Sequence, residues 1–173
     1  EAVTVSEQVG YGRGAARARA ALAMTYISLG RYDLALPLAE AACDYCIHSA
    51  AQDGVGLYTG MCGLALERMG RPEEAESLLR QAAAILHGCG ALFLAALVQM
   101  DLGTLLARQG RYAEARPALE AALAVFTDNQ APMERERTAA LLGLACWHSG
   151  DAARAHELAA AGWAQFNAHA PEG

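Results

Sequence analysis

The chain has 173 residues, of which 54% are hydrophobic and 6% aromatic, and a formal net charge of −6. This length suffices for one domain with a core or for a short repeat array, and the apolar fraction excludes a disordered tail. No apolar run approaches the ~18 residues needed to cross a bilayer, so no membrane segment is expected. The acidic balance argues against direct nucleic-acid binding by this segment, because neutralising phosphates requires a basic face.

Residue usage predicts an all-α protein. Alanine and leucine are abundant, β-branched residues are scarce, and every cation is an arginine. The absence of lysine also favours a GC-rich bacterial genome. Because no basic-then-apolar export signal is present, we expect a cytoplasmic protein with reduced thiols. The chain begins at Glu1 and not at a methionine, which we interpret as a piece of a longer protein.

An internal repeat of 40 residues organises the sequence. A glycine recurs at each step, with a helix-period apolar segment before it and another after it. Because glycine can end a helix with a positive φ, each repeat is predicted to be a helix, a tight turn and an antiparallel helix. First helices are expected at 15–29, 56–69, 92–109 and 135–149. The turn glycines are Gly30, Gly70, Gly110 and Gly150.

Columns of small residues keep the same register and would let paired helices approach closely. One column lies before the turn, at Ala23, Gly63, Gly103 and Gly143. Two columns lie after it, at Ala35, Ala75, Ala115 and Ala155 and at Ala42, Ala82, Ala122 and Gly162. One hairpin cannot bury its apolar face alone, so stacked hairpins are expected to share a core.

The pattern resembles the tetratricopeptide repeat (TPR) family, in its small columns, its turn glycine and the aromatic residues Tyr32 and Tyr112. The resemblance implies a right-handed superhelical solenoid of about four antiparallel helix-turn-helix repeats. We expect one domain over 1–173, with repeats at about 15–50, 55–90, 95–130 and 135–168, and the tail of a preceding repeat within 1–14. The usual TPR period is about 34 residues, whereas here it is 40, so a HEAT-type solenoid is the alternative fold.

No motif for catalysis or for metal binding stands out. Cys43 and Cys46 form a C-x-x-C inside an expected helix, where two packing residues are favoured over a redox or metal pair. The Cys146-Trp147-His148 run places cysteine and histidine on different helix faces and lacks an orienting third group. We therefore predict no enzyme activity, no catalytic residues, no metal site and no cofactor.

The TPR resemblance implies a concave groove lined by the first helix of each repeat. Its mixture of apolar, arginine and tryptophan side chains suits an amphipathic or acidic segment of a protein or peptide partner. The alternative is a sensor or regulatory segment of a multidomain bacterial transcriptional regulator. The apolar face of the last helix suggests a homodimer or a continuing array. The expected groove residues are Met24, Ile27, Leu64, Arg68, Met100, Thr104, Arg108, Arg137, Leu144, Trp147 and His148.

Overall fold

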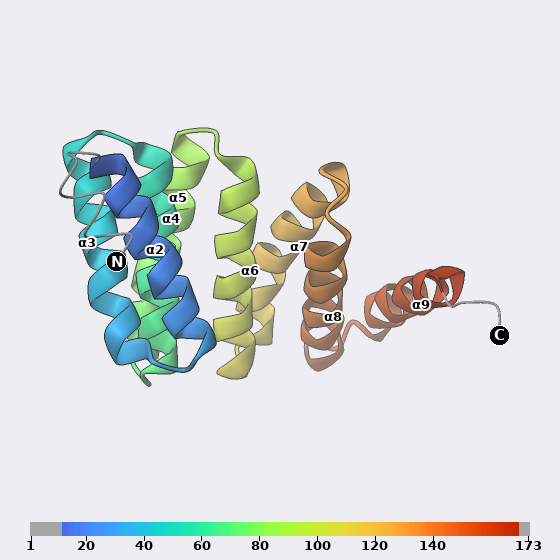
Figure 1. Ribbon diagram of the computed structural model, residues 1–173. Helices are drawn as coiled ribbons and strands as arrows, with labels where there is room; N and C mark the ends of the chain where they lie inside the picture. Colours follow the sequence, from blue (N-terminus) through green and yellow to red (C-terminus); the bar gives the residue numbers. More distant parts are fainter. Residues whose placement is uncertain (1–11, 170–173) are drawn as a thin grey trace. The chain divides into compact units, whose positions relative to one another are not determined.

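The computed structural model describes residues 12–169, and these residues form α-helices joined by short turns (Figure 1). The chain divides into two compact units, one ending at Val98 and one starting at Gln99, and α6 contributes to both. The helices are α2 (Gly12–Ser28), α3 (Tyr32–His48), α4 (Gln52–Arg68), α5 (Pro72–Gly88), α6 (Leu92–Arg108), α7 (Tyr112–Asp128), α8 (Pro132–His148) and α9 (Ala152–His169).

The turns that join these helices share one hydrogen-bonded geometry. At the turn from α2 to α3, the N–H of Gly30 donates to the carbonyl of Ile27, and the N–H of Arg31 donates to that of Tyr26. This is the Schellman motif, in which the residue after the helix takes a positive φ. The same bonds and the same sign of φ recur every 20 residues, at Gly30, Ala50, Gly70, Gly90, Gly110, Gln130 and Gly150.

In the first unit, glycines on α4 let the backbone of α5 approach closely. A Cβ added at Gly63 would lie 2.9 Å from Cγ of Leu79, and one at Gly56 would lie 2.5 Å from Cγ of Leu86. Both leucines are fully buried, so each fills the space that a glycine leaves open. Helix α3 packs between its neighbours α2 and α4, and α2 also contacts α4 directly.

In the second unit the same principle joins α6 to α7. A Cβ at Gly103 would lie 2.5 Å from Cγ of the buried Leu119. Phe126 of α7 is also fully buried, and α8 packs against both α7 and α9. An ion pair of 2.8 Å joins the guanidinium of Arg116 on α7 to the carboxylate of Asp151 at the start of α9.

The last hairpin is packed only near its turn. A Cβ at Gly143 of α8 would lie 3.8 Å from Cβ of Leu158, an ordinary contact that leaves room for a side chain. Beyond Leu158, residues 159–162 of α9 are exposed, and Figure 1 shows α9 diverging from α8 toward its C-terminal end. The two helices therefore open into a V that faces away from their turn.

The expected all-α fold of helix-turn-helix repeats is confirmed, with differences at the helix ends. Helix α4 starts at Gln52 and α8 at Pro132, each several residues before the expected start. Helix α2 starts at Gly12, within a glycine-rich run expected to be a flexible entry. Residues 1–11, expected to include the tail of a preceding repeat, lie outside the described residues.

Candidate functional site

The expected groove residues fall in both units and differ in how much surface they present. Arg68, Arg108 and Arg137 are exposed, as are Met24, Leu144, Trp147 and His148, whereas Ile27, Leu64 and Thr104 are half-buried. Met24, Ile27, Leu64 and Arg68 belong to the first unit, and the other seven belong to the second.

Met100 does not present surface to a partner, because only 4% of it is exposed. Its register position is that of Gly60 on α4, where an added Cβ would lie 2.9 Å from Cγ2 of Val98 on α6. This column therefore faces a neighbouring helix and belongs to the core. The sequence prediction for Met100 is wrong for that reason.

Helix α8 carries a continuous exposed stripe, formed by Met133, Arg137, Leu144 and Trp147. These positions follow each other at steps of four, seven and three residues, so they share one helix face. Met133 is 80% exposed, Leu144 46% and Trp147 64%. Scattered exposed apolar residues are normal on a protein, but three on one helix face with an arginine between them form a candidate contact surface.

His148 is held by an aromatic contact at the end of this stripe. Its ring stacks on that of Tyr112 with a centroid distance of 4.2 Å and an interplanar angle of 10°. The contact links the start of α7 to the end of α8 and fixes the orientation of the imidazole. We therefore regard His148 as a support for the neighbouring Trp147 and not as an independent anchor.

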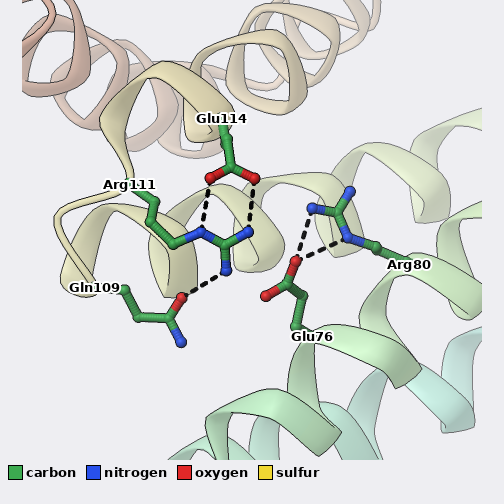
Figure 2. Close-up of polar contacts among 5 residues, drawn as sticks. All are labelled: Glu76, Arg80, Gln109, Arg111 and Glu114. Carbon is green, nitrogen blue, oxygen red and sulfur yellow. Dashed lines mark hydrogen bonds and ion pairs between the residues drawn. The ribbon is translucent and has the colours of Figure 1, made fainter.

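Arginines at the turns are engaged by acidic residues of the helices that they precede. Figure 2 shows the guanidinium of Arg111 donating to both carboxylate oxygens of Glu114 and to Gln109. Arg71 donates to Glu74 in the same way, and this guanidinium holds the pKa of the Glu74 carboxyl below its usual range. A second arginine in Figure 2, Arg80, donates to Glu76 on the same helix.

The proposed basic ladder of Arg68 and Arg108 is not a pair of free cations. The Nε of Arg68 lies 3.8 Å from a carboxylate oxygen of Glu67, and Arg108 also has an interaction partner. The two arginines belong to different units. Of the expected groove arginines, Arg137 on the α8 stripe is consequently the one that we use below.

The C-x-x-C of α3 is a packing element. The thiol of Cys43 lies 3.5 Å from Oγ1 of Thr59 and 3.8 Å from the carbonyl oxygen of Val55, both on α4. Cys46 is buried, and a Cβ added at Gly54 of α4 would lie 2.4 Å from its sulfur. All five cysteines are free thiols, and no metal-binding group of three or more ligands occurs among the described residues.

Thiol reactivity follows this packing and gives a first test of it. Burial raises the pKa of Cys62 to about 12, so at pH 8 roughly one thiol in ten thousand is ionised there. Cys89 is exposed. We expect Cys89 to react rapidly with a thiol reagent in the native protein and Cys62 only after denaturation, as read by mass spectrometry of the labelled peptides. Equally fast labelling of Cys62 would contradict the buried position.

The second unit also contains an apolar groove bounded by α7, α8 and α9, with a cavity volume of about 550 Å³. Nothing in the sequence pattern of the turns pointed to it, because it arises where α9 separates from α8. Its walls are described below with the ligand that they fit. In the part of the chain that the structure describes, no helix is long and apolar enough to cross a membrane.

Models of the tetratricopeptide repeat family match residues 15–48, 61–132 and 100–171. Together these matches cover most of the chain. No curated protein sequence matches it.

Solved structures with the same fold have low sequence identity to the chain. BtubC from P. vanneervenii matches with a TM-score of 0.78 and 20% identity, over 94% of this chain and 68% of BtubC. Aspartyl phosphate phosphatase F from Bacillus subtilis matches with a TM-score of 0.79 and 16% identity, over 93% of this chain but only 46% of the phosphatase.

A third match is a set of nearly identical TPR-like repeats from Podosopora anserina, with a TM-score of 0.69 and 20% identity, over 96% of this chain and 83% of that one. At these identities the structural matches support the fold alone. The family matches, the small-residue columns and the repeated helix-turn-helix geometry agree with one another. The chain belongs to the tetratricopeptide repeat family.

Proposed function

We propose that the chain is a protein-interaction module that binds an amphipathic or acidic segment of a partner protein. The observation that carries this proposal is the α8 stripe of Met133, Arg137, Leu144 and Trp147, which is exposed over several turns. Tryptophan and arginine are the residue types that most often dominate binding energy at interfaces. TPR modules are typically non-catalytic scaffolds, and the proposal needs no reacting group.

Charge on the stripe favours an acidic partner. Arg137 is the one charged position among these four residues, and the apolar side chains of Leu144 and Trp147 lie two and three turns further along the helix. A partner helix with apolar residues and one carboxylate would bury the apolar side chains and pair with the guanidinium. The remaining exposed groove residues, such as Met24 and Arg68 in the first unit, would extend this contact.

The proposal is tested by affinity capture from lysate of the source cells, followed by mass spectrometry. The baits are the parent chain, the double variant Arg137→Glu/Trp147→Ala, and a control variant Arg80→Glu on α5, which makes the same charge change away from the stripe. We expect one partner to be captured by the parent and by the control but at least about tenfold less by the double variant. Circular dichroism verifies that all three baits stay helical.

Equal capture by all three baits, or no captured protein, would remove the support for the stripe as a binding surface. Either result would favour the second candidate, a regulatory segment of a multidomain bacterial regulator acting within its own chain in the cytoplasm. A gene that encodes an ATPase and a helix-turn-helix domain beside this segment would support that candidate. A homodimer through the exposed face of α9 is the remaining alternative, and sedimentation of the purified chain at several concentrations would detect it.

A further inference from the structure

The groove bounded by α7, α8 and α9 has almost wholly apolar walls. Leu123 lines it from α7, Ala139 from α8, and Leu158 and Ala159 from α9. Its volume of about 550 Å³ lies within the range of roughly 300–1,000 Å³ that is typical of ligand pockets. The groove lies wholly within the second unit and is separate from the four residues of the α8 stripe.

The internal repeat shows what fills the corresponding space in the first unit. Shifted by 40 residues, Thr59 corresponds to Ala139 and Leu79 to Ala159. In the first unit these larger side chains close the space, since Thr59 contacts the thiol of Cys43 and Leu79 is fully buried against Gly63. In the second unit both positions are truncated to alanine, so the wall loses the branched side chain that seals it.

The open end of the groove has a second cause. On α4, Gly56 lies against the buried side chain of Leu86. The same register position on α8 is Glu136, whose side chain leaves no room for such a close approach by the hairpin partner. The V between α8 and α9 is thus written into the sequence at two levels, by small residues near the turn and by a glutamate at the open end.

Arg135 gives the groove a polarity. Its side chain is half-buried and lines the groove, and within residues 12–169 it has no ion-pair or hydrogen-bond partner. Glu136 also lines the groove but is exposed, so solvent screens its charge more strongly. A carboxylate placed next to the apolar side chains of a ligand would complement the unpaired guanidinium.

We propose that this groove binds one amphipathic α-helix of a partner protein, which inserts two leucine-sized side chains and places a carboxylate beside Arg135. The occupant is a helix because the bounding surfaces are helices, and because the same space between α3, α4 and α5 is filled from a helix. The leucine-sized requirement follows from the truncation at Ala159. This second surface is independent of the stripe proposed above.

The chain itself supplies a probe for this chemistry, since Leu79 and Leu86 of α5 fill the matching spaces on α4. We would measure fluorescence anisotropy of a labelled, end-capped peptide with the sequence of residues 72–88, titrated with the full 173-residue chain. We expect saturable binding, and at least about tenfold weaker binding of the same peptide with both leucines replaced by alanine. A peptide that carries His87→Glu, next to Leu86, should bind about threefold tighter than the parent peptide.

Variants of the full chain place the peptide in the groove. Ala159→Leu restores the leucine of the other repeats and fills the groove from within, so it should reduce peptide binding at least about tenfold. Ala160→Leu adds the same side chain to an exposed position on α9 that does not line the groove, and it should leave binding unchanged. Arg135→Gln should abolish the advantage of the His87→Glu peptide, while Trp147→Ala should have no effect.

Each other outcome overturns the proposal or part of it. Failure of the parent peptide to bind, or equal binding to the Ala159→Leu chain, would show that the groove does not accept such a helix. An unchanged advantage of the His87→Glu peptide with Arg135→Gln would remove the assigned role of the guanidinium. Self-association of the chain that is abolished by Ala159→Leu would identify a second copy as the occupant. Because Trp147→Ala serves as a control here, failure of the stripe would remain distinguishable from failure of the groove.

Discussion

Replacing Phe126 with alanine is expected to lower the free energy of unfolding by about 3–5 kcal/mol. Phe126 is fully buried in the second unit, near the C-terminal end of α7. Its carbonyl also accepts the hydrogen bond from the N–H of Ala131 that closes the turn to α8, at 2.9 Å. Loss of the ring leaves a cavity that the surrounding helices can close only in part. Urea denaturation followed by circular dichroism at 222 nm measures the change.

The matched control is Trp147→Ala, which removes a larger aromatic ring from a position that is 64% exposed. This variant should change the free energy of unfolding by no more than about 0.5 kcal/mol, because little buried surface is lost. A cost below about 1 kcal/mol for Phe126→Ala, or equal costs for both variants, would contradict the assigned packing of α7.

The regular part of the fold was predictable because it depends on local chemistry. Glycines such as Gly30 and Gly110 announce a positive φ, and the small columns announce close helix contacts, so a hairpin repeat follows from the sequence alone. The intervening turns were missed because Ala50 and Gln130 adopt the same geometry without glycine. Their backbone is fixed by the same pair of hydrogen bonds, which leave no trace in residue type. Gly90 was the visible signal of the 20-residue step.

The candidate site was predictable only in part, because exposure depends on which helix covers which column. Leu144 and Trp147 were expected on the surface and are exposed there, whereas Met100 was expected on the surface and is buried. Apolar side chains alone do not distinguish these positions. What distinguishes them is the neighbouring helix, as Gly60 and Val98 show for the column of Met100.

The groove could have been noticed from the sequence but not measured. The truncation from leucine to alanine at Ala159 and the exchange of glycine for glutamate at Glu136 are both visible once the repeats are aligned at 40 residues. The sequence does not say whether the helices close over such a gap or leave it open. The resulting volume depends on the divergence of α9 from α8, which is a property of the folded unit.

The second large effect concerns the contact of Gly103 with Leu119, where size is divided unequally between two helices. Leu119 is fully buried, so Leu119→Ala should cost about 2–5 kcal/mol in the free energy of unfolding. Gly103→Ala alone should cost about 1–3 kcal/mol, despite the better helix propensity of alanine, because its Cβ would meet Cγ of Leu119 at 2.5 Å. Urea denaturation of each variant measures these costs.

Combining the two substitutions should cost about 1–2 kcal/mol less than the sum of the single effects, because the added methyl then enters the space that the leucine vacated. The first repeat already uses this solution, since Ala23 and Ala39 hold the same register positions and both are fully buried. Gly143→Ala is the control, since its Cβ would lie 3.8 Å from the nearest atom, and it should stabilise the chain by about 0.5–1 kcal/mol. Strict additivity at Gly103 and Leu119, or destabilisation by Gly143→Ala, would show that the helix spacing is not set by these pairs. Opposite signs for alanine at two positions of one column would instead show that each repeat adjusts its own helix distance, and that the last hairpin has been left open.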